Sequence, residues 1–142
     1  MQILEVAHYD ARVLTALNRL LPQLSSSASP LTEAELRRII DAESSHLLMA
    51  EVEGELVGSL TLAMFRIPTG VRAWIEDVVV SDTARGHGVG RALNEHAIAL
   101  AKRLGVKTLN LTSRPSREAA NALYQKIGFK TRETNVYRYD IE

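Results

Sequence analysis

The chain has 142 residues, of which 17 are Lys or Arg and 17 are Asp or Glu, and it contains no cysteine. This length favours one domain whose core is stable without disulfides or a structural metal. The charge balance argues against an overall basic field that would attract nucleic acid or an anionic membrane, so any anion binding has to be local. The lack of cysteine excludes disulfides, thiolate metal sites and a cysteine nucleophile together.

The N-terminal residues MQILEVAHYD lack a basic start followed by an apolar run, and no stretch reaches the roughly 20 apolar residues of a membrane span. We therefore expect a single domain over residues 1–142, a cytoplasmic location, and neither a nucleic-acid nor a membrane partner.

The first half of the chain predicts a short strand, two helices and three strands. Apolar residues in 10–21 recur at helical spacing, and Pro22 is expected to end that helix. In 31–43, Thr32 precedes Glu35 by three residues, which is the capping-box pattern of a helix start. Residues 46–65 predict two strands joined by a hairpin turn at Glu53 and Gly54, and 71–80 predict a third strand of β-branched character.

The second half predicts a long helix from Gly88 to Leu104, closed by Gly105. A strand is expected over 107–113, a helix over 116–127, and a last pair of strands over 129–141 with a bend near 133–135. The pattern therefore predicts an α/β (α+β) chain with seven strands and four helices, and it shows no internal repeat.

The stretch VVVSDTARGHGVGRAL, residues 78–93, joins an apolar strand to this long helix through three alternating glycines. A strand, a glycine-rich turn and a helix start together expose several backbone N–H groups at the positive end of the helix dipole. The stretch therefore predicts an anion-binding site.

Two nucleotide-binding motifs fit this loop poorly. A P-loop needs Lys and Ser/Thr after its glycines, whereas Gly90 is followed by Arg91 and Ala92. The dinucleotide fingerprint needs glycine where Arg91 stands, and its strand should open the domain. The pattern that does match is Arg-x-x-Gly-x-Gly, formed by Arg85, Gly88 and Gly90.

With this motif the chain resembles the GNAT superfamily of N-acetyltransferases. A second block, AANALYQKIGF over 119–129, is similar to a later helix of that superfamily that ends at Gly-Phe. The resemblance covers nearly the whole chain and implies a mixed, mostly antiparallel seven-stranded sheet that is splayed between its fourth and fifth strands and flanked by four helices.

The resemblance implies that backbone amides of the loop hold the pyrophosphate of acetyl-CoA, with Arg85 and Arg91 adding positive charge. The glycines let the backbone approach the phosphates closely. Strand residues before the loop would offer backbone groups to the pantetheine arm. The alternative is a plain strand-to-helix turn with solvated arginines. The cofactor-binding residues expected in this way are Val78, Val79, Val80, Arg85, Gly86, His87, Gly88, Val89, Gly90, Arg91, Ser113, Arg117, Asn121 and Tyr124.

Two residues are candidates for catalysis. Tyr124 is at the position of the GNAT tyrosine near the CoA sulfur, where a phenol can protonate the leaving thiolate. Glu76 is at a position where some members carry a glutamate base, although Asp77 points to the opposite face unless a β-bulge intervenes. The alternative roles are a packed core tyrosine and an ordinary strand carboxylate.

One departure from the family pattern concerns the helix over 116–127. Many members carry asparagine where this chain has Arg117, which could reach a phosphate or cap its own helix instead. Ser113 and Asn121 are weaker candidates for the cofactor, and Arg114 is held extended by the following proline.

The acceptor site is expected between the first two helices and the last strands. Its candidate residues are Gln23, Glu76, Arg114, Tyr137 and Arg138. The histidines, at positions 8, 46, 87 and 96, lack metal-ligand spacing, and we expect no metal.

The sequence thus predicts an N-acetyltransferase that moves the acetyl group of acetyl-CoA to a primary amine of a small molecule or a peptide by direct attack in a ternary complex. The alternatives are a transferase for a longer acyl-CoA, a non-catalytic acyl-CoA sensor and a nucleotide-binding protein. Final strands in this fold often pair between subunits, so a homodimer is also allowed.

Overall fold

The computed structural model describes residues 1–141, which form two compact units, the first spanning Met1–Thr112 and the second starting at Ser113. The first unit contains β1 (Gln2–Glu5), α1 (Ala11–Leu24), α2 (Glu33–Asp41), β2 (Ser45–Val52), β3 (Glu55–Ile67), β4 (Gly70–Val80), the 3₁₀ turn η1 (Asp82–Ala84), α3 (Val89–Arg103) and β5 (Thr108–Asn110). The second unit contains α4 (Glu118–Ile127). None of the helices in these residues is long and apolar enough to cross a membrane.

The strands of the first unit form one sheet in the order β1-β2-β3-β4-β5, antiparallel except for the parallel pair β4–β5. The predicted hairpin turn is confirmed, because Glu53 and Gly54 both have positive φ, 50° and 82°, as a two-residue turn of this type requires. The β4–β5 pair spans only Arg72–Trp74 of β4. Beyond Trp74, β4 therefore pairs with β3 alone among the described strands.

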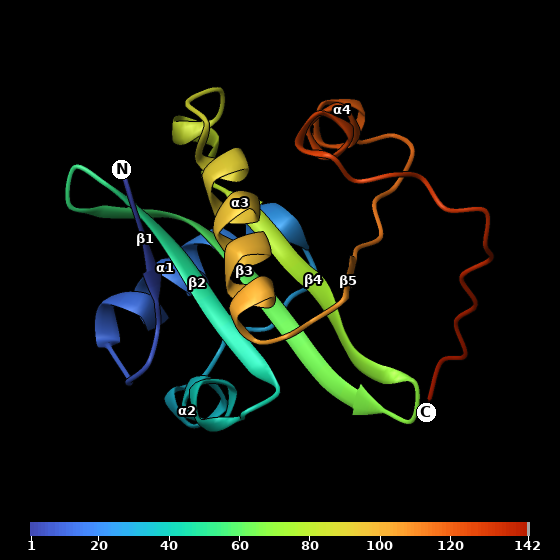
Figure 1. Cartoon of the computed structure of the whole chain (residues 1–142). Coiled ribbons are helices and arrows are strands. Elements are labelled where there is room, and N and C mark those ends of the chain that lie inside the picture. The colour runs from blue at the N-terminus through green and yellow to red at the C-terminus, as the bar shows by residue number, and fades with distance from the viewer. Residues whose placement is uncertain (142) are drawn as a thin grey trace. The chain divides into compact units, whose positions relative to one another are not determined.

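Helices cover both faces of this sheet (Figure 1). The first face packs against α1 and α2 in a core that includes Leu17, Leu20, Leu36, Leu47 and Met49. Residues that lie opposite each other on neighbouring antiparallel strands point to the same face of the sheet. The register therefore places a second set of apolar residues on the other face, which α3 covers: Leu48, Leu60, Leu62 and Ile75.

The approach of α3 to the sheet depends on Gly58 in β3. A Cβ added there would lie 3.0 Å from Cγ1 of Val89 and 3.2 Å from Cδ1 of Leu93, both closer than ordinary van der Waals contact. The missing side chain thus lets the first turns of α3 rest directly on the strand.

The start of α2 agrees with the prediction from the sequence, whereas the end of α1 differs from it. Thr32 caps α2, and its Oγ1 accepts a hydrogen bond from the Glu35 N–H at 3.2 Å, as the capping-box pattern predicts. Helix α1, however, continues through Pro22 to Leu24. A proline in the last turn removes a single helix hydrogen bond, and Leu24 still packs on the core, so the expected end at Pro22 is wrong.

The predicted pair of strands over 129–141 is also absent, and the sheet has five strands rather than seven in the described residues. Residues 129–141 form neither helix nor strand. A strand is stabilised by the backbone groups of its neighbour rather than by propensity alone. The apolar alternation of this segment indicated a strand without specifying a partner.

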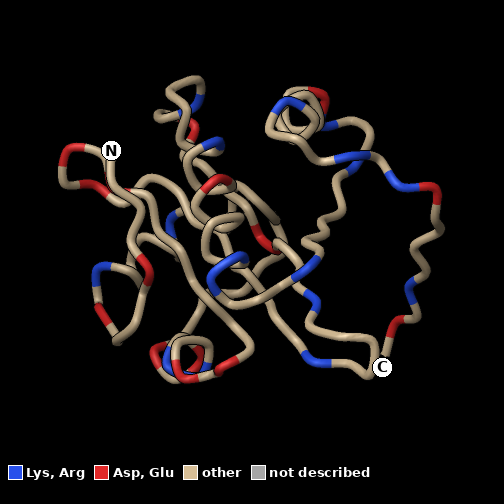
Figure 2. The backbone as a smooth tube through the Cα atoms, in the orientation of Figure 1, with Lys and Arg blue, Asp and Glu red and all other residues tan. Residues whose placement is uncertain are grey.

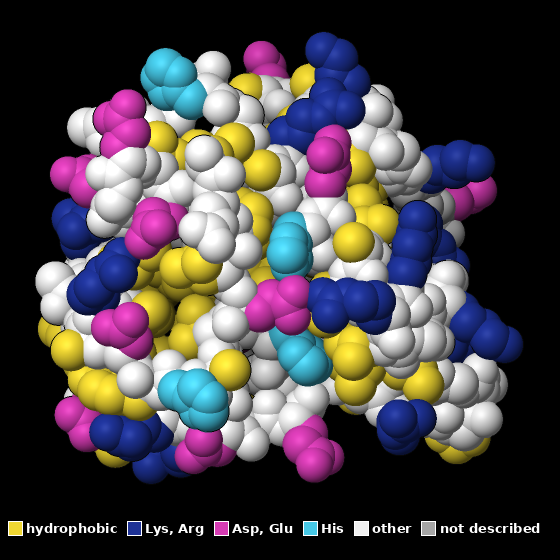
Figure 3. Space-filling model, turned by 60° about the vertical axis from the view of Figure 1, so that its left-hand side comes forward, with side chains coloured by type: hydrophobic (Ala, Val, Ile, Leu, Met, Phe, Trp, Pro, Cys, Tyr) yellow, Lys and Arg dark blue, Asp and Glu magenta, His cyan; other side chains and the backbone are white. Residues whose placement is uncertain are grey.

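Acidic, basic and histidine side chains are scattered among hydrophobic and other side chains on the face shown in Figure 3. The Glu5 carboxylate accepts hydrogen bonds from Nε2 of His96 at 2.8 Å and from the Arg103 guanidinium at 2.6 Å, which ties β1 to α3. These bonds, led by that from His96, lower the pKa of Glu5 below its usual value of 4.5, although partial burial opposes the shift.

We expect Glu5→Gln to lower the free energy of unfolding at pH 7 by about 1 kcal/mol or less, because the carboxylate is partly exposed. A carboxylate whose pKa is lower in the native state than in the unfolded state stabilises the native state at pH values above its unfolded-state pKa. This stabilisation is lost as the pH falls through the native-state pKa. The difference from wild type should therefore vanish in acid. Urea unfolding at several pH values measures it, with Glu33→Gln as the control for an exposed helix pair; a difference that persists in acid would contradict the assignment.

Candidate functional site

The glycine-rich loop connects β4 to α3 as the sequence predicts. Gly86 and Gly88 have φ of 83° and 79°, the left-handed region that favours glycine. Gly88 is the N-cap of α3, and no side chain caps the helix. The first N–H groups of α3 thus lack the side-chain acceptor that usually satisfies one of them.

The loop has open space beside it for a ligand. A Cβ added to Gly86 or Gly88 would meet no atom within 4 Å. Gly90 lies in the first turn of α3 and does not have a positive φ. The backbone conformation therefore does not require glycine there, and the predicted reason for this glycine is the close approach of a ligand. The loop therefore combines uncapped amides with room for an anion.

Both arginines of the loop have acidic partners nearby. The Arg85 guanidinium lies 3.0 Å from the Asp82 carboxylate, and that of Arg91 lies 2.6 Å from Glu95. All four side chains are at least half exposed, so these ion pairs are weak and exchangeable. Acidic and basic positions are interspersed here as elsewhere in the first unit (Figure 2). A bound anion would compete with Asp82 and Glu95 for the two guanidinium groups.

A β-bulge interrupts β4 just before the loop. Thr61 pairs with Glu76 and Ser59 pairs with Val79, so two residues of β4, 77 and 78, stand opposite one residue of β3. Asp77 has φ of 50°, which is unusual for a residue with a side chain. The bulge puts Glu76 and Val79 on one face, and since Val79 belongs to the core of α1 and α2, Glu76 points to the side of those helices.

The residues before the loop have the backbone environment expected for a ligand that adds to a sheet. From residue 75 onward, the edge of β4 away from β3 has no strand partner in the described part of the chain. Val78, Val79 and Val80 lie in this part of the strand, and their side chains are buried or half-buried. Their side chains therefore pack, while their backbone borders an open strand edge.

In the second unit, Tyr124 lies in the last turns of α4. Its ring makes an edge contact with Phe129, with 5.8 Å between centroids, and the Phe129 N–H donates to the Tyr124 carbonyl at 2.9 Å. Burial raises the pKa of Tyr124 above its usual value of 10, although the charge of Arg117 opposes the shift. The phenol therefore stays protonated at neutral pH and is able to donate a proton.

The start of α4 is held by Asn121. Its Nδ2 donates to the carbonyls of Arg114 and Arg117, each at 2.9 Å. Arg117 is the N-cap residue, but its side chain makes no capping hydrogen bond. Asn121 thus has a local structural role, and the exposed side chain of Arg117 does not cap its own helix. Ser113 and Arg114 precede the helix in irregular chain.

Tyr137 and Arg138 lie in the irregular segment that follows α4 and are exposed. The Tyr137 hydroxyl accepts a hydrogen bond from Nδ2 of Asn135 at 3.4 Å. Side chains alternate between two faces only in a strand, and this segment forms none. The predicted contact of Tyr137 and Arg138 with an acceptor therefore stays a prediction.

Asn94 is a residue near the loop that the sequence reasoning missed. It is 1% exposed, its Nδ2 donates to the Gly90 carbonyl at 2.8 Å, and its Oδ1 meets no donor in residues 1–141. The signal in the sequence was a polar residue, asparagine, among the apolar residues on one side of the predicted helix. By bonding the Gly90 carbonyl, Asn94 stiffens the first turn of α3, where the loop ends.

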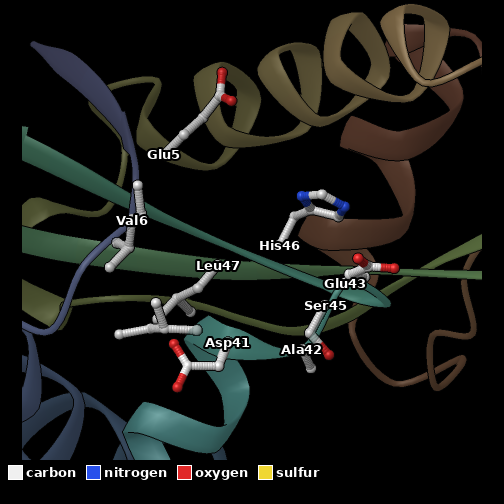
Figure 4. Close-up of a pocket in the computed structure, with 10 residues that line it drawn as sticks. Glu5, Val6, Asp41, Ala42, Glu43, Ser45, His46 and Leu47 are labelled. Carbon is white, nitrogen blue, oxygen red and sulfur yellow. The ribbon is translucent and has the colours of Figure 1, made fainter.

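A cavity of about 290 Å³ lies elsewhere, lined by residues that include Glu5, Asp41, His46 and Leu47. Glu5 and His46 point to one side of the sheet, whereas Asp41 and Leu47 lie on the other (Figure 4). The register places this cavity away from the loop. Ser45, at the start of β2, pairs with Ala63, which pairs with Trp74 in the middle of β4, whereas the loop follows Val80 at the end of β4. The polar groups of the cavity do not converge. Among the described residues no group of three or more His, Asp and Glu side chains could hold a metal ion.

Comparisons with known proteins agree with this geometry. Residues 13–129 match the model of the "Acetyltransferase (GNAT) family". The chain is 30% identical over 128 residues to an L-2,4-diaminobutyric acid acetyltransferase of Nocardia farcinica, covering 82% of this chain and 65% of that protein. It is 32% identical over 116 residues to a glucosamine 6-phosphate N-acetyltransferase of Trypanosoma brucei brucei, covering 76% and 77%.

Among solved structures, an aminoglycoside acetyltransferase from an uncultured soil metagenomic sample has a TM-score of 0.88 at 19% identity, covering 99% of this chain and 95% of that one. At this identity the likeness concerns the fold alone. The family match extends over most of the chain and includes the glycine-rich loop, the bulged strand and α4. The chain belongs to the GNAT acetyltransferase family.

Proposed function

We propose that the protein is an N-acetyltransferase that uses acetyl-CoA as its co-substrate. The observation that carries this proposal is the loop of positive-φ glycines leading into an uncapped α3, directly after the bulge in β4. Backbone N–H groups of residues 85–91 would hold the pyrophosphate, and the open edge of β4 at Val78–Val80 would pair with the pantetheine arm.

In this proposal the chain supplies proton transfer at both ends of the reaction. Glu76, directly or through a water, takes a proton from the acceptor ammonium so that the neutral nitrogen can attack the thioester carbonyl. A new C–N bond forms, the C–S bond breaks, and Tyr124 gives its phenolic proton to the departing thiolate. The phenol carries its proton at neutral pH even at its usual pKa of 10, and the raised pKa of Tyr124 keeps it protonated. Since the chain has no cysteine, transfer would be direct, in a ternary complex.

We further propose that the acceptor is a small primary amine that also carries an acidic group. The support is chemical: the names of two relatives describe a diamino acid and a phosphorylated amino sugar, each an amine with a carboxylate or a phosphate. A peptide amine, a longer acyl-CoA and a non-catalytic acyl-CoA sensor are the alternatives that the experiment has to separate.

The decisive experiment is calorimetry of the full chain with acetyl-CoA, a longer acyl-CoA, NAD and ATP, followed by thiol-release assays over a panel of amines. The panel includes 2,4-diaminobutyrate, glucosamine 6-phosphate, an uncharged amine of similar size and a short peptide. We expect acetyl-CoA binding in the micromolar range and thiol release with an acidic amine. Binding without release by any amine would favour a sensor, and tighter binding of NAD or ATP would overturn the proposal.

Gly88→Asp should weaken acetyl-CoA binding at least 100-fold, because it places a carboxylate beside the phosphates at the start of α3. Gly88→Asn is the matched control, since asparagine tolerates the same positive φ and has the same size but no charge. Calorimetry compares the two variants, and equal affinities would refute the assignment of the loop to phosphate binding.

Tyr124→Phe should lower kcat by about 100-fold with little change in acetyl-CoA affinity, because it removes only the phenolic hydroxyl and leaves the ring in place. Steady-state kinetics with the acceptor that the amine panel identifies measures the change. Tyr139→Phe, in the segment after α4, controls for the loss of a hydroxyl elsewhere. Retention of full activity would exclude Tyr124 as the acid.

Glu76→Gln should lower kcat/KM most strongly at low pH, where the acceptor amine is protonated and needs a base. The matched control is Asp77→Asn, which neutralises the neighbouring exposed carboxylate of β4. A pH–rate profile that is unaltered in Glu76→Gln, or altered equally in both variants, would exclude a base role for Glu76.

A further inference from the structure

The sequence places Gln23 in the acceptor site, but the structure gives its side chain a different partner. Gln23 lies in the last turn of α1, and its Oε1 accepts a hydrogen bond from the backbone N–H of Asp82 at 3.0 Å. Asp82 is the first residue of η1, whose first N–H groups have no acceptor within the turn itself. Gln23 therefore caps η1 from another element, 59 residues away in the sequence.

The other hydrogen bonds near the start of the loop do not position it in the same way. The Ser81 N–H donates to the Val57 carbonyl at 2.7 Å and attaches the end of β4 to β3. After that point the bonds from Ala84 to Ser81 and from Arg85 to Asp82 are internal to the loop and move with it. In the described residues, the bond from Asp82 to Gln23 is the hydrogen bond that joins residues 82–87 to another element.

Gln23 is itself supported by a rigid neighbourhood. One turn earlier in α1, the Arg19 guanidinium donates to the Leu56 carbonyl at 2.6 Å, next to the residue that accepts the Ser81 N–H. On the same helix, Asn18 exchanges two hydrogen bonds with the backbone of Leu31, at 2.7 and 3.0 Å. The end of α1 is therefore fixed to the sheet and to the start of α2, so that it can hold the loop in place.

We propose that Gln23 is a positioning residue for the anion-binding loop and contributes to acetyl-CoA affinity without touching either substrate. This inference rests on the proposed function, because it assumes that the loop holds the pyrophosphate of acetyl-CoA. Helix α1 packs on the face of the sheet toward which Glu76 points. Through Gln23, the same helix would then also hold the anion-binding loop in position.

The test uses the full chain with Gln23→Met, which keeps the length of the side chain and removes the acceptor oxygen. Hydrogen exchange of the Asp82 amide should become faster than in wild type. The dissociation constant for acetyl-CoA, measured by calorimetry without acceptor, should rise about fivefold, which corresponds to the loss of one neutral hydrogen bond. The acceptor KM at saturating acetyl-CoA should stay within twofold of wild type.

Two further variants complete the design. Gln23→Glu keeps an acceptor oxygen and should retain the slow exchange of the Asp82 amide. Gln2→Met makes the same chemical change on β1, away from the loop, and should alter neither exchange nor affinity. Thermal unfolding of each variant verifies that it is folded.

The outcomes separate the two proposals. If wild-type protein does not bind acetyl-CoA, the proposed function fails, and the inference about Gln23 fails with it. If wild type binds and Gln23→Met binds equally well, the positioning role is overturned and the function stands. A rise in acceptor KM with unchanged acetyl-CoA affinity would also overturn it and would return Gln23 to the acceptor site.

Discussion

The N-terminus of α3 imposes the constraint on which the rest of the structure depends. Its first backbone N–H groups have no acceptors within the helix, and the N-cap is a glycine that offers no side-chain oxygen. Water meets this need in the free protein, whereas an anion meets it better. The surroundings keep these groups in place: Gly58 allows α3 to rest on β3, Asn94 bonds the Gly90 carbonyl, and the loop is bonded at its start to β3 and α1.

In the proposed function, the donor and the acceptor belong to opposite faces of the sheet. On one face, α3 packs against β3 and presents its N-terminus at the carboxyl end of β4. On the other face, α1 and α2 pack around Leu47, Met49 and Val79, and Glu76 points the same way. The bulge at Asp77 is what brings Glu76 and Val79 to the same face although they are three residues apart. A regular strand would have turned one of them toward α3.

Local signals in the sequence predicted most of the helices, strands and turns. They could not predict the contacts between segments that are distant in the sequence. Thr32 with Glu35, the pair Glu53–Gly54 and the glycines of the loop each set the backbone locally, so their structures could be predicted. The continuation of α1 past Pro22 depends on tertiary packing of Leu24, and the missing strands over 129–141 depend on a partner. The bond between Gln23 and Asp82 joins two exposed polar residues that no periodicity relates. For the same reason the sequence named Gln23 as a site residue without its partner.

Asp77 has a consequence for engineering this protein. A side chain at φ of 50° in a strand costs on the order of 1 kcal/mol or more in conformational energy, which the neighbouring pairs of β3 and β4 have to offset. A search for thermostable variants would favour glycine there, or deletion of the extra residue to restore a regular ladder. Deletion would leave Glu76 opposite Thr61 and Val79 opposite Ser59, so both would keep their face, but it would remove the local twist that the bulge adds where β4 leads into the loop. Selection for stability alone would therefore alter the backbone at the point where the proposed function places the donor.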